Sequence, residues 1–196
     1  MQIRSIVIGF FLCCAFRSLA ETPVFNVTDT LKSPRYFNSL HFGGLAGAKG
    51  AGTTPTVATF HGVALHKWRL GLGIGYDNYD RWTVVPMYGM FSVDIARLKK
   101  NRLYLTLAAG YNKPHRNGDD ETFVYKPSSA TTVSPLVGYR IQSGKWNINF
   151  QAGYKWQRVG YTFERRYWLA IGTKQPEYEV VEMMERLVIH VGFGFN

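Results

Sequence analysis

The sequence predicts an all-β protein, an eight-stranded antiparallel up-and-down transmembrane β-barrel that follows a cleaved signal peptide. Three observations favour this fold: apolar residues recur at every second position, the connecting segments alternate in length, and the chain begins with an export signal. The composition agrees, because 15 % of the residues are aromatic and 20 are glycines. Membrane barrels use these two kinds of residue for their girdles and their crowded interiors.

Residues 186–195 show the alternation most clearly. Successive side chains of a strand point to opposite faces, so every second residue shares a face. One face is apolar and ends in aromatic residues, whereas the other carries small or polar residues such as Gly192 and Gly194. This pattern is typical of a barrel strand with lipid outside and a narrow interior. The apolar face consists of Leu187, Ile189, Val191, Phe193 and Phe195.

The same alternation recurs along the chain and predicts seven further strands. Residues 56–65 are the least regular, because Phe60 and Val63 do not fall on the same row, so the faces of that strand stay unassigned. Pro86 is expected at a bulge or a strand end, since proline cannot donate to a ladder. The eight expected strands are 36–46, 56–65, 69–77, 82–95, 103–111, 133–141, 146–157 and 186–195.

The connections alternate as a closed up-and-down barrel requires. Three links are short, at 66–68, 96–102 and 142–145. An even number of strands places these turns and both termini on the periplasmic side, with the longer loops facing outward. The remaining links are mostly longer and hold glycine, proline and mixed charges. They cover about residues 47–55, 78–81, 112–132 and 158–185.

The amino terminus predicts export through a Sec-type signal peptide. Arg4 precedes an apolar run, and the small residues up to Ala20 favour cleavage after that position. The expected organisation is therefore a signal peptide at 1–20, a short periplasmic lead segment at 21–33, and an outer-membrane barrel at 34–196. Both cysteines lie within the signal peptide, so the exported chain is expected to form no disulfide or thiolate metal site.

The net charge favours anionic partners. The exported chain has 21 basic and 13 acidic residues, a balance of about +8 with neutral histidines. Export argues against nucleic acid as the partner, and the phosphates of an anionic membrane surface fit this charge better. The expected partners are outer-membrane lipids and lipopolysaccharide, together with the barrel-assembly machinery during biogenesis. A monomer is expected.

Side-chain size separates a membrane barrel from a soluble lipocalin-like barrel with an apolar pocket. The polar rows carry many glycine, alanine, asparagine and threonine residues, as a narrow eight-stranded interior demands, so the apolar rows should face lipid. Charged residues on the polar rows should then fill the lumen as a network of ion pairs and hydrogen bonds. The members expected in this network are Arg69, Asp77, Asp94, Arg140, Lys155, Arg186 and His190.

The segment 158–185 is the most distinctive candidate surface. Parts of it, around 159–163 and 178–184, alternate well enough to extend the last two strands beyond the membrane as a protruding hairpin. It could instead be an ordinary variable loop. Basic residues stand among its aromatic residues, so contact with anionic lipid or a partner is expected there. These basic residues are Arg158, Arg165, Arg166 and Lys174.

Several segments resemble a known family. The chain is similar to the small outer-membrane β-barrel proteins of the OmpX and OmpA-transmembrane type, particularly the exported single-barrel family common in Bacteroidota. The resemblance implies an integral outer-membrane barrel in the cell outer membrane. The matching segments are YFNSLHFGG at 36–44, GLGIGYD at 71–77, VPMYG at 85–89, LAAGY at 107–111 and VIHVGFGFN at the carboxyl end.

Three functions are compatible with such a barrel. The first is a structural, adhesive or surface-interaction role, the second a narrow solute channel, and the third a lipid A-modifying enzyme. Ser39 and His41 share a face, but residues two apart lie about 7 Å apart along a strand, and no orienting carboxylate is evident. The scattered histidines show no metal-ligand spacing. We therefore expect no catalytic, cofactor or metal site.

Overall fold

The structure is a computed structural model that describes residues 34–47, 52–118, 122–165 and 177–195. The expected signal peptide and lead segment, 1–20 and 21–33, lie outside the described residues. Strands account for nearly all of the described chain, and the described residues include no helix long and apolar enough to cross a membrane. The strands are β1 (Arg35–Gly47), β2 (Thr53–Leu65), β3 (Trp68–Asn78), β4 (Trp82–Leu98), β5 (Asn101–Arg116), β6 (Phe123–Ser128), β7 (Ala130–Ser143), β8 (Trp146–Arg165) and β9 (Tyr178–Phe195).

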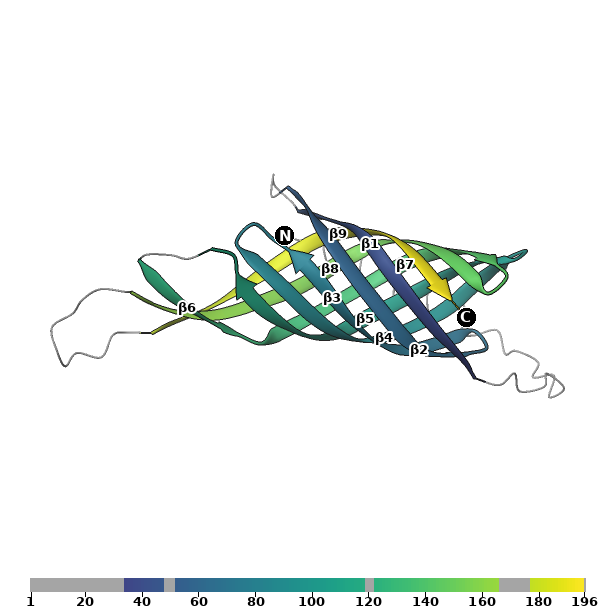
Figure 1. The fold of residues 1–196 in the computed structure, drawn as a ribbon, viewed down its shortest axis with the longest axis horizontal. Helices are drawn as coiled ribbons and strands as arrows, with labels where there is room; N and C mark the ends of the chain where they lie inside the picture. The colour runs from purple at the N-terminus through teal and green to yellow at the C-terminus, as the bar shows by residue number, and fades with distance from the viewer. Residues whose placement is uncertain (1–33, 48–51, 119–121, 166–176, 196) are drawn as a thin grey trace, which may run out of the picture. The chain divides into compact units, whose positions relative to one another are not determined.

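Eight of these strands close into an antiparallel ring. The order is β8, β7, β5, β4, β3, β2, β1 and β9, and β9 pairs again with β8 to complete the circle. The eight-stranded barrel predicted from the sequence is thus confirmed, and all eight predicted segments fall within ring strands. Figure 1 shows the strands tilted around a common axis, as barrel closure requires.

The ninth strand, β6, lies within the segment 112–132 that the sequence assigned to a loop. It pairs with the far part of β8, from Phe123 opposite Arg165 to Ser128 opposite Gly160. On the other side of β8, the pairing with β9 extends to Phe163 opposite Tyr178. We call these three strand portions the projecting sheet: β6, residues 158–165 of β8 and residues 178–185 of β9. They lie together at one end of the barrel in Figure 1.

The two ends of the barrel differ. One end, here called the turn end, carries three two-residue turns, His66–Lys67, Lys99–Lys100 and Gly144–Lys145. Each turn begins with a positive φ, 55° at His66, 57° at Lys99 and 60° at Gly144, which closes a hairpin tightly. The opposite end, here called the loop end, carries the other connections and the projecting sheet. The carboxyl end of β9 lies at the turn end (Figure 1).

Two backbone features of β4 differ from the sequence prediction: the position of Pro86 and the position of a bulge. Pro86 lies well inside β4, at neither a bulge nor a strand end, and the pairing of β3 with β4 keeps the same register on both sides of it. The ladder instead lacks the pairs at Val85 and Pro86, because proline offers no N–H there. The bulge of β4 lies farther along, between Asp94 and Ala96.

The lumen is packed by matching large side chains with glycines on the neighbouring strand. A Cβ atom on Gly138 of β7 would lie 2.2 Å from Cζ of Tyr104 on β5, and one on Gly73 of β3 would lie 2.3 Å from a ring carbon of Phe60 on β2. The Phe60 contact settles the faces of β2, since Phe60 is buried in the lumen whereas Val63 and Leu65 are exposed on the outside. The glycines therefore fix where the interior aromatic residues fit.

Replacing Gly138 with valine should destabilise the barrel by about 1–3 kcal/mol or more, because the new side chain overlaps the buried Tyr104 ring. The measurement is denaturant unfolding in detergent. Gly89→Val is the matched control, since a Cβ there meets only a carbonyl oxygen at 3.7 Å. Adding Tyr104→Ala to Gly138→Val should recover part of the loss. Equal effects at both glycines would contradict this packing.

Candidate functional site

The outer wall of the barrel carries an apolar band between two sets of aromatic residues. Thr59 and His61 of β2 interrupt it, and they hydrogen-bond to each other, with a further bond between His61 and Tyr36. Trp68 and Tyr76 of β3 are eight residues apart, and Trp146 and Trp156 of β8 are ten apart. At about 3.3 Å per residue and a tilt near 40°, these spacings correspond to roughly 20–25 Å along the barrel axis, close to the height of the apolar band of outer-membrane barrels. The exposed apolar side chains of the band include Leu70, Leu72, Ile74, Leu105, Leu107, Val137, Ile148, Phe150, Ile189 and Val191.

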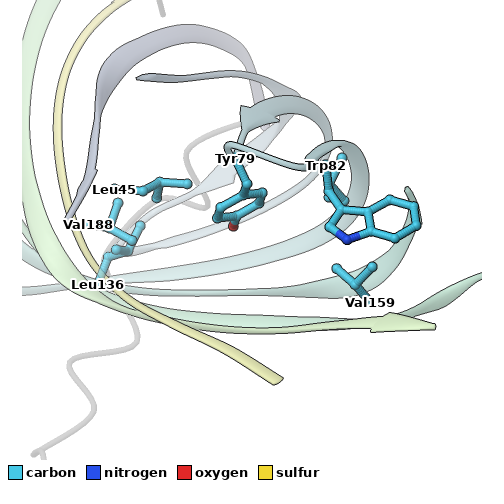
Figure 2. Packing of buried hydrophobic residues seen from close by; sticks show 7 residues of the cluster. Leu45, Tyr79, Trp82, Leu136, Val159 and Val188 are labelled. Carbon is cyan, nitrogen blue, oxygen red and sulfur yellow. The ribbon is translucent and has the colours of Figure 1, made fainter. Parts of the chain in front are cut away.

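An apolar plug closes the lumen at the loop end. Tyr79 and Trp82, from the short β3–β4 connection and the start of β4, fold into the barrel. In Figure 2 the Tyr79 ring lies between the aliphatic residues on one side and Trp82 with Val159 on the other. The plug is thus built from β1, β4, β7, β8 and β9 together. Its buried members are Leu45, Tyr79, Trp82, Val84, Leu136, Val159 and Val188.

Below the plug, Lys155 and Asp77 form a buried ion pair across the lumen. Their side chains are 4 % and 1 % exposed, and Lys155 Nζ contacts Asp77 Oδ2 directly. Lys155 also donates to the Tyr88 hydroxyl at 2.7 Å, and Thr56 donates to Asp77 Oδ1 at 2.6 Å. Both charges are therefore satisfied by an opposite charge and a further hydrogen bond, the arrangement that a buried pair needs.

A second polar cluster lies nearer the turn end. Arg140 is buried, and its Nη1 lies 3.0 Å from Asp94 Oδ1 while its Nε donates to Asn149 Oδ1 at 3.0 Å. The partly exposed Arg102 contacts the other oxygen of Asp94 at 2.6 Å. The Arg140 guanidinium also lies over the Tyr104 ring, 4.3 Å from its centre. A single carboxylate thus serves two arginines.

The other residues expected in the lumen network lie inside the barrel but with different partners. The guanidinium of Arg69 lies 5.3 Å from the centre of the Phe37 ring, and that of Arg186 lies 5.4 Å from the Tyr79 ring. His190 is buried with its ring centre 6.1 Å from that of His41. The structure therefore brings together Lys155 with Asp77 and Arg140 with Asp94, whereas Arg69 and His190 lie near these ion pairs without joining either of them.

Sequence reasoning missed two features of the lumen. Ser39 and His41 were judged too far apart for direct contact, but Ser39 Oγ lies 3.0 Å from His41 Nε2. Their side chains bend along the strand toward each other, which the backbone spacing alone does not reveal. The lumen also holds a second apolar cluster, which no alternation of polar residues indicated. It consists of Phe37, Ala58, Phe60, Tyr88, Met90 and Ala108.

The projecting sheet has an aromatic face and a charged edge. Tyr161 of β8 packs against Trp82 of the plug with ring centres 4.9 Å apart, and Tyr125 of β6 and Phe163 of β8 continue this row of rings away from the barrel. The guanidinium of Arg116 lies 3.3 Å from the centre of the Tyr125 ring. The aromatic face therefore joins the sheet to the plug as one packed unit.

Ion pairs hold β6 against the rest of the projecting sheet. Lys126 contacts Glu164 of β8 and lies 3.1 Å from Glu177, beside the start of β9. These hydrogen bonds raise the pKa of Lys126, and the contact with Lys126 lowers the pKa of Glu164. Both shifts favour the charged forms, so the pairing of Lys126 with Glu164 persists at neutral pH.

The basic residues expected to contact lipid are only partly described. Arg158 is exposed on the outer face of β8, two residues beyond Trp156, and it pairs with Met183 of β9. The backbone of Arg165 ends β8, and its side chain is not described. Arg166 and Lys174 lie outside the described residues. Within the described residues, no group of three histidine, cysteine or acidic side chains could hold a metal ion.

Comparison with solved structures finds proteins of similar fold. No protein-family model and no curated protein sequence matches the chain. The crystal structure of Neisserial surface protein A is similar with a TM-score of 0.57 at 11 % identity, over 84 % of this chain and 99 % of that one. Outer membrane protein AlkL in lipid bilayers has a TM-score of 0.48 at 13 % identity, over 86 % and 92 % of the two chains. A major outer membrane protein from Thermus thermophilus has a TM-score of 0.47 at 11 % identity, over 82 % and 100 %.

The first of these likenesses spans nearly the whole described barrel and agrees with the closed ring of eight strands. The outer wall independently shows the apolar band and aromatic borders that contact with lipid requires. By its fold and its outer wall, the chain is an eight-stranded outer-membrane β-barrel.

Proposed function

We propose that this protein is a closed barrel that acts at the cell surface through its projecting sheet, in a structural, adhesive or surface-interaction role. The observation that carries the proposal is the continuation of β8 and β9 beyond the aromatic border at Trp156, with β6 added at their side. Strands that only line a membrane wall have no need of this extension. An ordered sheet outside the membrane offers a rigid surface for contact.

The interior supports a closed barrel better than a solute channel. The apolar plug fills the loop end, and the two charged clusters and the second apolar cluster fill the lumen below it. An eight-stranded barrel is only wide enough to be filled by side chains. We therefore keep a narrow channel as the alternative, and planar-bilayer conductance of the purified barrel is the measurement that would favour it.

An activity on lipid A has less support. Ser39 and His41 are hydrogen-bonded, which is the first element of an activated hydroxyl. Among the described residues, however, no carboxylate hydrogen-bonds to His41 to orient it, and His41 is buried in the lumen, away from the lipid. Comparing the mass of lipid A from cells with and without the protein would test this activity.

The partner that fits the projecting sheet best is anionic outer-leaflet lipid, with lipopolysaccharide as the natural source of phosphate groups. Arg158 stands exposed just beyond Trp156, the position at which a headgroup phosphate would lie. The nearby chain adds Arg165, Arg166 and Lys174. We further propose a monomer that requires the barrel-assembly machinery for insertion and has no nucleic-acid partner.

Changing Arg158, Arg165, Arg166 and Lys174 together to glutamine should leave the barrel folded but reduce its binding to lipopolysaccharide vesicles. Exposed charges attract over about 8 Å at physiological salt, so wild-type binding should also weaken as salt rises. The measurement is co-flotation of detergent-solubilised protein with vesicles across a salt series.

The matched control removes four exposed basic residues from the turn end instead: Arg97, Lys99, Lys100 and Lys145. It lowers the net charge by the same amount and should leave flotation close to that of wild type. Identical flotation of wild type and the first variant at every salt concentration would show that the projecting sheet does not bind anionic lipid. Equal losses in both variants would indicate attraction by net charge alone.

A further inference from the structure

A small cavity lies inside the lumen, on the turn-end side of the Lys155–Asp77 pair. Its volume is about 20 Å³, and most of the residues that line it, from β1, β3, β4, β5, β7 and β8, have polar side chains. The apolar plug lies toward the other end of the barrel, so among the described residues the shorter way out of this cavity is toward the turn end. The polar and charged residues used below are Ser39, Arg69, Ser92, Thr106, Arg140 and Gln151.

The charges around the cavity do not balance. Arg69 and Arg140 both line it, whereas none of the described carboxylates does. Asp94 is the only described acidic partner of Arg140, and Asp94 is shared with Arg102. No described carboxylate forms an ion pair with Arg69, whose guanidinium contacts the Phe37 ring. This part of the lumen therefore has more positive than negative charge, and such an excess is costly away from water unless an anion offsets it.

The uncharged groups of the wall also suit an anion. The hydroxyl of Thr106 donates to Ser92 Oγ at 3.0 Å, which leaves the Ser92 proton for an acceptor inside the cavity. Ser39 adds a second hydroxyl, whose proton is available to an anion when His41 Nε2 is the donor of the bond between them. Gln151 is 6 % exposed, and its Oε1 has no hydrogen-bond partner among the described residues. The amide of Gln151 already hydrogen-bonds to Tyr104, so Gln151 is not counted among the donors to the anion.

We propose that this cavity binds one small inorganic anion of the size of chloride, held by Arg69 and Arg140 and by the hydroxyl groups of Ser92 and Ser39. The volume favours a small anion, because about 20 Å³ is room for about one water-sized particle. A bound anion would act as the missing counter-charge of the barrel interior. It would thereby stabilise the folded barrel in proportion to its occupancy.

The direct test uses chloride itself as the probe. Wild-type protein in a neutral detergent is titrated into sodium chloride, and the width of the ³⁵Cl NMR line is recorded. Binding should broaden the line in proportion to protein, and bromide, which is only slightly larger, should reverse the broadening. Phosphate at the same ionic strength should not reverse the broadening. No broadening would overturn the proposal, and reversal by phosphate would overturn the assignment to a chloride-sized anion.

The second test measures stability. The thermal unfolding midpoint of wild type should rise by about 2–4 °C when sodium gluconate is replaced by sodium chloride at constant ionic strength, because gluconate is too large for the cavity. Arg69→Gln should abolish both this rise and the line broadening. Arg158→Gln removes an equal charge from the outer surface. This variant should retain the chloride-dependent rise of the unfolding midpoint and the broadening of the ³⁵Cl line.

The outcomes separate a site from a general salt effect. A chloride-dependent rise that persists in Arg69→Gln, or one that is lost equally in Arg158→Gln, would overturn the proposal. If Arg69→Gln does not fold, Arg69→Lys keeps the charge and should retain a weaker response, and the wild-type NMR titration decides independently. Vesicle flotation is not expected to change in either Arg69 variant, so this test is distinct from that of the surface role.

Discussion

Replacing Lys155 with methionine is expected to destabilise the barrel by about 3–5 kcal/mol, because it leaves the carboxylate of Asp77 buried without an opposite charge. Thr56 would remain as a hydrogen-bond donor to Asp77, which does not replace a cation. The measurement is denaturant unfolding in detergent micelles, followed by the gel shift of the folded barrel.

The double change Lys155→Met and Asp77→Leu is the informative control. It removes both charges, so it should destabilise the barrel less than Lys155→Met alone. Lys126→Met breaks an exposed pair on the projecting sheet and should cost less than about 1 kcal/mol. Arg140→Met should cost less than Lys155→Met, since Asp94 keeps its contact with Arg102. Single and double changes that simply add would contradict a coupled pair.

Replacing Leu72 with arginine is expected to cost about 2–4 kcal/mol, because the new charge would enter the hydrocarbon layer near its midplane. Leu72 is 74 % exposed in the middle of β3, where exposure means contact with lipid. The measurement is unfolding of the protein refolded into lipid vesicles, since micelles let an arginine reach water more easily.

Ser129→Arg is the matched control for this change. Ser129 is exposed between β6 and β7 at the loop end, outside the apolar band, so arginine should be tolerated there. Equal stability of the two variants in vesicles would mean that the outer face of β3 does not contact lipid.

The strands of the wall were predictable because alternation is a local property. Leu70, Leu72 and Ile74 face outward in the structure as their spacing predicts. The inner and outer faces of β2 could not be predicted from the sequence. Phe60 points inward, where Gly73 on the next strand leaves room for its ring. The strand β6 was missed for a similar reason. It is six residues long, contains Pro127, and is stabilised by pairing with a part of β8 that lies beyond the membrane.

Alternation along each strand was enough to assign the charged residues of the lumen to the inner face. It could not predict which of these residues would pair with each other. Asp77 and Lys155 are 78 positions apart and meet only because ring closure brings β3 and β8 to face each other across the lumen. Asp94 and Arg140 are 46 positions apart, on strands β4 and β7 that are not neighbours in the ring. The cavity is likewise a property of six strands together and has no sequence signature.

Two of the prolines in the ring strands, Pro86 and Pro135, lie where the pairing with a neighbouring strand is interrupted, and the two interruptions differ. Next to Pro135, the pairing of β7 with β8 is interrupted, but Ser134 Oγ donates to the Tyr154 carbonyl at 3.3 Å and so replaces a missing backbone donor. Next to Pro86, no described side chain donates across the interruption between β3 and β4. A carbonyl that faces lipid has no water to turn to. The wall is therefore expected to open more readily between β3 and β4, beside Pro86, than between β7 and β8, beside Pro135.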